Sequence, residues 1–390
     1  MYLSNDEEKI LNGEQGEAAQ KAMQLITALG DIYKADKLIP IKSVQVAGVS
    51  YKTIGDAGID FIRFFKEKNA KVVVPTTLNP AGCDIENWKE IGFDENFVNK
   101  QKEIIDIFGS LGINTTCTCT PYYIGNRPGL GDHIAWAESS AVSFSNSVLG
   151  ARTNREGGPS ALAASIVGKT ANYGYHLEEN RKAKFVINVE ADLKTKTDFG
   201  LLGVHVGKIV EKAVPAFKIQ NSNVPEHYMK ALGAAMAASG AVALYYIENT
   251  TPEFVLDDSP EQITVTNDDL QKAKDDLTTG ESADLIAFGC PHCSLEEIKE
   301  IADIVKDKQI NKKFWVCVAR QIKKQADEQG YTETIEKAGG KMVCDTCPVV
   351  SPIEHMGYTT TATDSGKCAK YLPSFCKQKV IFGSAEELLK

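Results

Sequence analysis

The chain has 390 residues, of which 43% are hydrophobic and 24% charged, and it carries a formal net charge of −9. This length exceeds one ordinary hydrophobic core and predicts two or three domains, and the composition excludes a disordered chain. No basic stripe interrupts the acidic balance, so we expect no nucleic-acid partner.

The sequence also gives no sign of export or of a membrane anchor. The N-terminus MYLSNDEEKI is polar from its fourth residue and has no apolar core of a signal peptide. The run 228–247 contains Lys230 and is mostly alanine and glycine, which favours a buried helix and strand over a membrane span. We therefore expect a cytoplasmic protein whose ten cysteines stay reduced and serve metal binding or catalysis.

Apolar runs alternate with amphipathic segments in the first part of the chain. Their spacing predicts, in chain order, a strand at 41–48, a helix at 54–68, a strand at 71–78, a helix at 97–112, a β-like segment at 113–120 and a helix in the first half of 132–151. These alternations are typical of α/β proteins.

The clearest unit lies near the C-terminus. After a linker at 251–262, strands and helices alternate over 263–266, 268–277, 283–289, 294–307, 312–319, 321–330 and 340–345. Short apolar strands joined by helices predict a parallel sheet that is covered on both faces.

Three cysteines follow the ends of predicted strands. Cys119 follows the strand at 113–118, Cys290 directly follows the strand at 283–289, and Cys347 follows the strand at 340–345. Ligands of open α/β sheets gather where strands end, so these positions are candidates for a site.

Two readings of these cysteines rely on C-x-x-C pairs. Cys290 and Cys293 could form a redox pair, although such motifs normally open a compact domain rather than lie within a parallel series. Cys344 and Cys347 could complete a zinc site with them. The gap between the two pairs is 50 residues, against roughly 15–20 in a zinc ribbon.

Two other interpretations of the cysteines do not require C-x-x-C pairs. Cysteines are often small buried hydrophobic residues, and we expect this of Cys83, Cys317, Cys368 and Cys376. Alternatively, one thiolate from each of three loops could hold a [4Fe–4S] cluster and leave one iron open as a Lewis acid. The ferredoxin run C-x-x-C-x-x-C is absent, which disfavours an electron carrier.

Four segments of the chain resemble the large subunit of the aconitase X family in order. They are 116–161 (which contains TCTPYYIGNRPG), 289–298 (GCPHCSLEEI), 344–352 (CDTCPVVSP) and 364–371 (DSGKCAKY). The resemblance covers essentially the whole chain. It implies an α/β fold of aconitase-like three-layer domains around a central cleft. We divide the chain into an N-terminal α/β region (1–115), a central cluster- and substrate-binding region (116–250) and a C-terminal parallel βαβ region (251–390).

The resemblance implies an iron–sulfur hydro-lyase. The archaeal branch of the family removes water from (R)-5-phosphomevalonate to give trans-anhydromevalonate 5-phosphate, in isoprenoid synthesis, and bacterial relatives dehydrate cis-3-hydroxy-L-proline. The family's cluster ligands fall on Cys119, Cys290 and Cys347, which leaves Cys293 a bystander. Cys117 or Cys344 could replace a neighbour.

The resemblance places substrate contacts on four short segments: Gly48, Val49 and Ser50; Asn79 and Pro80; Glu138 and Ser139; and Lys367. From the residues alone, 47–53 is either a turn that offers N–H groups to phosphate or an ordinary β–α turn capped by Ser50. Glu138 follows Trp136 and Ala137, which indicates partial burial.

For several other polar residues the sequence allows two roles. Arg152, Asn154 and Arg155 could bind a carboxylate or could tie domains together. His133 and His292 could polarise groups near a cluster, but a structural histidine is the commoner case.

The resemblance implies a partner as well. The family's swivelling domain carries the serine that acts as base, and this chain stops at VIFGSAEELLK, before any such domain. We therefore expect no catalytic base on this chain and a small subunit that supplies it.

Overall fold

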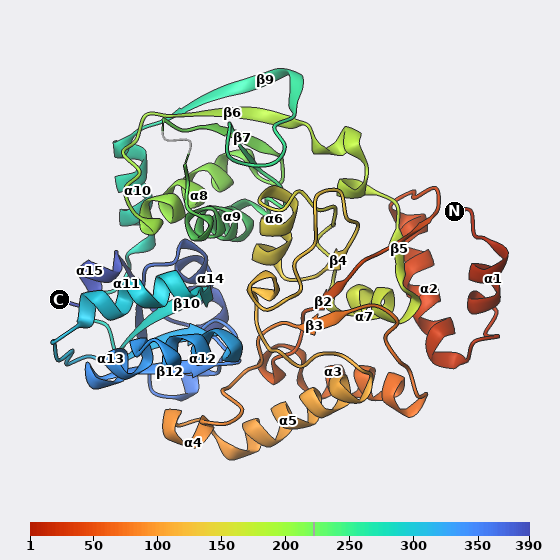
Figure 1. Ribbon diagram of the computed structural model, residues 1–390, viewed down its shortest axis with the longest axis horizontal. Helices are drawn as coiled ribbons and strands as arrows, with labels where there is room; N and C mark the ends of the chain where they lie inside the picture. Colours follow the sequence, from red (N-terminus) through yellow and green to blue (C-terminus); the bar gives the residue numbers. More distant parts are fainter. Residues whose placement is uncertain (221–222) are drawn as a thin grey trace.

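The computed structural model describes residues 1–220 and 223–390, in which three groups of strands and helices surround a common centre (Figure 1). The N-terminal part, from α1 to β5, has a parallel sheet of order β3-β2-β4 and an antiparallel pair β1-β5. Its strands are β1 (Leu38–Pro40), β2 (Val44–Val46), β3 (Thr76–Leu78), β4 (Ala135–Trp136) and β5 (Lys169–Ala171). Its helices are α1 (Asn5–Leu11), α2 (Glu17–Ile32), α3 (Tyr51–Glu67), α4 (Trp88–Ile91), α5 (Glu95–Ser110), α6 (Ser139–Ser147) and α7 (Gly158–Val167).

The middle part, from β6 to α10, has a four-stranded parallel sheet of order β8-β7-β6-β9. It comprises β6 (Ala183–Val189), α8 (Lys196–Val210), β7 (Pro215–Lys218), α9 (Glu226–Gly240), β8 (Tyr246–Ile247), β9 (Leu256–Val265) and α10 (Asn267–Leu277). Helices α8 and α9 lie against each other so closely that a Cβ added at Gly203 would come within 2.5 Å of the Leu232 carbonyl oxygen. The buried helix and strand predicted over 228–247 are confirmed as α9 and β8.

The C-terminal part, from β10 to α15, has a five-stranded parallel sheet of order β12-β11-β10-β13-β14. Its strands are β10 (Leu285–Cys293), β11 (Phe314–Val318), β12 (Gly340–Cys344), β13 (Thr360–Thr363) and β14 (Lys379–Phe382). Its helices are α11 (Leu295–Val305), α12 (Arg320–Glu328), α13 (Tyr331–Lys337), α14 (Gly366–Cys376) and α15 (Ala385–Leu388).

Alternate residues of this sheet enter two different apolar cores. Leu285 and Ala287 join one core, whereas Ile286 and Phe288 join the other. Successive side chains of a strand point to opposite faces, so the sheet is covered on both sides. The predicted α/β fold class is confirmed.

Several predicted elements have other bounds or partners. The segment 263–266 is the end of β9, which pairs with β6 and belongs to the middle sheet. The predicted linker at 251–262 contains the first part of that strand. The helix expected in the first half of 132–151 begins only at Ser139, because the Glu138 side chain caps it there.

Three further strand predictions need correction. In 71–78 only Thr76–Leu78 is a strand, and 113–120 contributes a single bridge, Thr77 with Asn114. The strand expected to end at 289 continues to Cys293 with an irregular register after Phe288. Backbone geometry at strand ends depends on neighbours distant in sequence, which a local pattern does not contain.

Ion pairs join the C-terminal part to the other two. Arg320 on α12 contacts the Asp84 carboxylate of the N-terminal part at 2.9 Å. Lys196 on α8 contacts Asp364 at 2.7 Å and Glu297 at 3.0 Å. The loops that follow the sheets are therefore held at fixed mutual positions.

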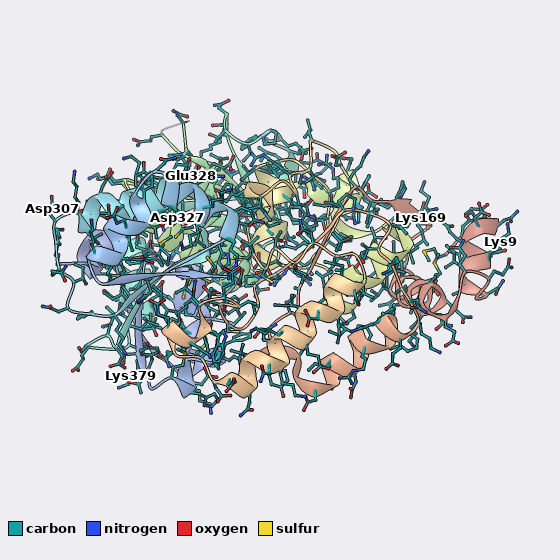
Figure 2. All side chains as sticks on the ribbon, turned by 60° about the horizontal axis from the view of Figure 1, so that its bottom comes forward. Lys9, Lys169, Asp307, Asp327, Glu328 and Lys379 are labelled. Atoms are coloured by element: carbon teal, nitrogen blue, oxygen red, sulfur yellow. The ribbon has the colours of Figure 1, made fainter. Side chains whose placement is uncertain are left out.

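Charged side chains such as Lys9, Asp307 and Lys379 project from the periphery of the molecule (Figure 2). Within the described residues, no helix combines the length and the apolar character that a membrane crossing requires.

Candidate active site

The carboxyl ends of strands in the N-terminal and C-terminal parts meet. The Ser50 hydroxyl, after β2, donates to the Val350 carbonyl at 2.7 Å. The Ala81 amide, after β3, donates to the Asp345 carbonyl, after β12, at 2.7 Å. Two sheets thus present their strand ends to one another, which is where α/β proteins bind ligands.

The three cysteines predicted as cluster ligands, Cys119, Cys290 and Cys347, gather between these strand ends. All three are buried, and the thiols of Cys290 and Cys347 are hydrogen-bonded to each other. The Cys119 thiol interacts electrostatically with Cys347 and accepts a hydrogen bond from the His292 amide at 3.2 Å. Residues 171 positions apart in the chain, Cys119 and Cys290 (290 − 119), therefore share one site.

These thiols hold their protons tightly. Burial raises the pKa of Cys119 to about 12. The hydrogen bond with Cys290 and burial raise the pKa of Cys347 well above its ordinary value. The pKa of Cys290 is also raised. The hydrogen bond with Cys347 lowers this pKa, but the hydrogen bond with Cys368 and burial together raise it by more. A metal centre bound here would displace these protons.

The two C-x-x-C pairs do not form one site. Cys290 and Cys347 join the core on one face of the C-terminal sheet, whereas Cys293 and Cys344 join the core on the opposite face. The geometry thus contradicts both the four-thiol zinc site and the Cys290–Cys293 redox pair. In the described part of the chain, no three His, Cys, Asp or Glu side chains could hold a single metal ion.

The remaining cysteines divide into core residues and one neighbour of the site. Cys83, Cys317 and Cys376 are buried, as expected. Cys117 lies in the apolar core of the N-terminal part, away from the group. Cys368 is buried as predicted, but its thiol also contacts Cys290, which its helical position did not indicate.

A buried ion pair lies beside the thiols. Glu138 accepts hydrogen bonds from the Ala141 amide at 2.6 Å and from the Ser140 hydroxyl at 2.5 Å, and it pairs with Lys367. The Ser139 hydroxyl donates to the same carboxylate at 3.4 Å. Lys367 also interacts electrostatically with Cys290 and Cys119.

The pair is ionised in spite of its burial. Burial raises the pKa of Glu138, but the Lys367 ammonium group and the hydrogen bonds outweigh it, so that the pKa lies below its ordinary value. Burial lowers the pKa of Lys367, but Glu138 together with Cys290, Cys119 and Tyr371 raises it by more, so that the pKa lies above its ordinary value. A fixed positive charge therefore stands next to three neutral thiols.

The strand-end loops of the N-terminal part supply the other predicted residues. Gly48 is exposed with φ +74°, and the Val49 carbonyl accepts from the Gln101 amide at 2.9 Å. Ser50 does not cap α3 with its side chain, because its hydroxyl is bound to Val350.

The second of these loops carries an unpaired polar atom. Pro80 is buried, and the Oδ1 atom of Asn79 is buried without a hydrogen-bond partner among the described residues. A buried amide oxygen costs about 1–3 kcal/mol when it is left unsatisfied. Asn79 is thus placed to accept a hydrogen bond from a ligand.

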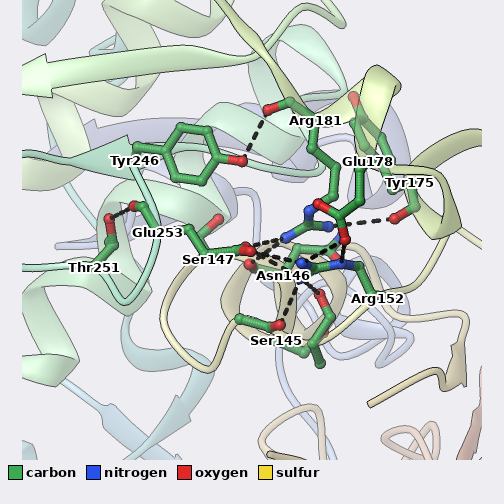
Figure 3. Close-up of polar contacts among 12 residues, drawn as sticks. Ser145, Asn146, Ser147, Arg152, Tyr175, Glu178, Arg181, Tyr246, Thr251 and Glu253 are labelled. Carbon is green, nitrogen blue, oxygen red and sulfur yellow. Dashed lines mark hydrogen bonds and ion pairs between the residues drawn. The ribbon is translucent and has the colours of Figure 1, made fainter. Parts of the chain in front are cut away.

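Arg152 ties parts of the chain together through ion pairs with two carboxylates (Figure 3). Its guanidinium group contacts Glu253 at 2.6 Å and Glu178 at 2.9 Å, and Arg181 contacts the other oxygen of Glu253 at 2.8 Å. Glu253 belongs to the middle part, so the pair of arginines fixes that part to the N-terminal one.

The structure also shows the surroundings of Asn154, Arg155 and His133, for which the sequence allowed two interpretations. The Asn154 side chain bonds to the Tyr173 carbonyl and the Tyr175 amide, at 3.0 and 2.9 Å. Arg155 is exposed and makes no ion pair within 1–220 and 223–390. His133 contacts His176 at 3.0 Å.

The structure is thus an α/β protein in which buried thiols from three strand-end loops gather at one candidate site. Models of the first, second and third domains of aconitase X match residues 1–179, 183–275 and 283–390. The chain belongs to the aconitase X family.

Known relatives agree with this assignment. The phosphomevalonate dehydratase large subunit of Methanocaldococcus jannaschii is 55% identical over 100% of both chains, and that of Thermococcus kodakarensis is 54% identical over 96% of each. The cis-3-hydroxy-L-proline dehydratase of Pseudomonas aeruginosa is 31% identical, over 96% of this chain and 67% of its own.

A solved structure is also similar over the whole chain. The holo-form of Thermococcus kodakaraensis aconitase X superposes with a TM-score of 0.94 at 51% identity, and the match covers 100% of this chain and 99% of that one. The resemblance inferred from four sequence segments is confirmed.

Proposed function

We propose that this chain is the large subunit of a hydro-lyase that converts (R)-5-phosphomevalonate to trans-anhydromevalonate 5-phosphate. The observation that carries the proposal is the gathering of three buried thiols beside an ionised Glu138–Lys367 pair. Relatives named phosphomevalonate dehydratase large subunit are up to 55% identical, whereas those named cis-3-hydroxy-L-proline dehydratase are 31–32% identical.

Cys119, Cys290 and Cys347 would hold a [4Fe–4S] cluster. The donor set fits this group, because soft thiolate ligands select iron–sulfur clusters. When bound through three cysteines, the cluster supplies an open Lewis-acid position that assists the departure of hydroxide.

Lys367 would bind the substrate carboxylate. Dehydration of a 3-hydroxy carboxylate places negative charge on the carboxylate side of C2, and a fixed cation in a water-poor cavity stabilises that charge. Glu138 keeps Lys367 charged and in place, since both its oxygen atoms accept hydrogen bonds from fixed groups. Asn79 would accept a hydrogen bond from the substrate.

The phosphate would bind at the loop after β2. Gly48 is exposed there, and a residue without a side chain lets a phosphate approach the backbone closely. Arg155 provides a cation that no carboxylate of the described chain neutralises.

A small subunit would provide the base that removes the C2 proton. Glu138 is unsuited to that task, because its pKa is lowered and its oxygens are engaged by Lys367, Ser140 and Ala141. The name "large subunit" carried by the archaeal relatives supports a two-chain enzyme.

The test is an anaerobic assay of the two-subunit complex with both substrates. We expect loss of water from (R)-5-phosphomevalonate, followed by mass spectrometry, and no turnover of cis-3-hydroxy-L-proline. Full activity of the large chain alone would contradict the partner, and preference for hydroxyproline would contradict the substrate.

A further inference from the structure

One histidine touches all three cysteine loops. His292 is fully buried in β10, two residues after Cys290. Its ring atom Nδ1 lies 2.9 Å from the Thr118 hydroxyl, and Nε2 lies 2.9 Å from the Thr346 carbonyl oxygen. Thr118 immediately precedes Cys119 and Thr346 immediately precedes Cys347, so the ring joins both loops to its own.

The backbone of His292 is engaged as well. Its amide donates to the Cys119 thiol at 3.2 Å, and its carbonyl accepts from the Lys230 ammonium group at 2.8 Å. Lys230 lies on α9 and is paired with Glu297. Each polar group of this residue therefore contacts a different partner, and each partner lies more than 50 residues away or on another loop.

The hydrogen-bond partners fix the tautomer of the ring. A backbone carbonyl only accepts, so Nε2 carries the hydrogen and donates it to Thr346. Nδ1 then accepts from the Thr118 hydroxyl, which itself accepts from the Thr120 amide at 3.2 Å. Each hydrogen bond in this series is therefore donated in the same direction, from the loop of Cys119 through the His292 ring to the loop of Cys347.

We propose that His292 is a positioning residue that sets the relative placement of the Cys119, Cys290 and Cys347 loops, and that the Thr118 hydroxyl locks its ring. The inference rests on the proposed function, in which these thiols hold a cluster. The hydrogen bonds of the ring go to Thr118 and Thr346 and not to a predicted ligand sulfur. It acts by holding the backbone on both sides, as residues behind metal ligands commonly do.

The chain offers a closely matched set of variants. Thr118→Val keeps the shape of the side chain and removes the hydroxyl, whereas Thr118→Ser keeps the hydroxyl. Thr116→Val is the control, because the Thr116 hydroxyl is buried two residues away and has no hydrogen-bond partner among the described atoms.

The experiment measures iron and sulfide per chain in the reconstituted two-subunit complex, and the rate of cluster loss after a chelator is added. We expect Thr118→Val to lose its cluster about tenfold faster than wild type, the usual cost of removing a residue behind a metal ligand. Thr118→Ser and Thr116→Val should behave as wild type. The electron paramagnetic resonance spectrum of the reduced cluster should change only in Thr118→Val.

A second variant guards against a folding failure of the first. His292→Gln keeps a donor for the Thr346 carbonyl and loses the acceptor for Thr118, so it should accelerate cluster loss equally. The double variant should be no worse than His292→Gln alone, because both changes remove the same bond.

Cluster loss at the wild-type rate in both Thr118→Val and His292→Gln would overturn the inference while leaving the proposed function intact. A wild-type complex that binds no iron would instead overturn the proposed function, and the inference with it.

Discussion

The cysteine group and the Arg152–Glu253 junction are both buried polar clusters between parts of the chain, yet they differ in how their groups are partnered. At the junction two arginines share one carboxylate and donate further hydrogen bonds to backbone carbonyls, while the Nε atom of Arg181 has no partner among the described residues (Figure 3). In the cysteine group Glu138 and Lys367 are also paired, and the three thiols beside them have raised pKa values and interact with that pair and with one another.

This difference helps to distinguish buried groups that stabilise the fold from buried groups that could take part in a reaction. Buried ion pairs occur in both places, so pairing alone does not separate a structural cluster from an active site. What marks the cysteine group is three thiols with raised pKa values from three separate loops, beside the ammonium group of Lys367. The variants below test this distinction, beginning with the largest expected effect.

Loss of a thiol of the cysteine group should abolish catalysis. Cys290→Ala removes one of the proposed cluster ligands, so we expect no measurable turnover and a large loss of bound iron. Cys293→Ala is the matched control on the opposite face of the same strand, and its cost should be about 1 kcal/mol of stability with activity retained. Active Cys290→Ala enzyme, or inactive but folded Cys293→Ala enzyme, would reverse the roles of the two faces.

Loss of the positive charge of Lys367 should have the second-largest effect on turnover. Lys367→Met keeps the length of the side chain and removes the charge, so turnover should fall by about 10²–10³ through lost stabilisation of the developing anion. Iron content should stay near that of wild type, which separates this variant from the cysteine variants. Steady-state kinetics and iron analysis decide, and a change of only a few fold would remove Lys367 from the reaction.

At the junction the expected effect is on stability instead. Glu253→Gln removes the ion-pair partner of the buried Arg181 and leaves Arg152 with the exposed Glu178 alone, which should lower the free energy of unfolding by about 3–5 kcal/mol. Glu178→Gln is the control, since that side chain is 72% exposed and should cost less than about 1 kcal/mol. Denaturant unfolding measures both, and a loss of turnover by folded Glu253→Gln would show that the junction takes part in the reaction.

The smallest effect concerns pH and a third buried carboxylate. Glu156 has hydrogen bonds from Ser160 and Thr170 but no cation, and burial raises its pKa above 4.5. The folded state therefore binds the proton more tightly than the unfolded state, and this contribution to stability is full below 4.5 and is lost as pH rises through the folded pKa. Glu156→Gln should remove that decline.

Glu253 gives the opposite sign and so provides the comparison. Burial raises its pKa, but Arg152 and Arg181 lower it by more, so its contribution is present above 4.5 and is lost as pH falls. Unfolding free energies of wild type, Glu156→Gln and Glu253→Gln across the acid range measure both slopes. Equal slopes in wild type and Glu156→Gln would contradict the account of that carboxylate.

Local patterns predicted much of the fold but not its pairings. Composition indicated the buried α9–β8 segment, and apolar patterning identified most strands of the C-terminal sheet, because both signals lie within a short stretch of the chain. The patterning assigned 263–266 to the wrong sheet, since the partner of β9 is β6, more than 70 residues earlier. A strand's own sequence does not specify which edge it joins.

The site was predictable to the same degree. The rule that ligands gather at strand ends brought Cys119, Cys290 and Cys347 forward, and they do lie together. The rule did not identify Cys368, because Cys368 lies in the first turn of a helix. His292 was a candidate from the sequence, but its bonds to Thr118 and Thr346 were not predictable, because these partners come from distant loops. Only the family resemblance singled out Lys367.

The most direct test of the account is anomalous diffraction at the iron absorption edge from crystals of the complex grown without oxygen. We predict one compact iron peak within bonding distance of the Cys119, Cys290 and Cys347 sulfur atoms, absent from Cys290→Ala crystals. Iron bound elsewhere on the chain, or three free thiols in crystals of active enzyme, would contradict the account.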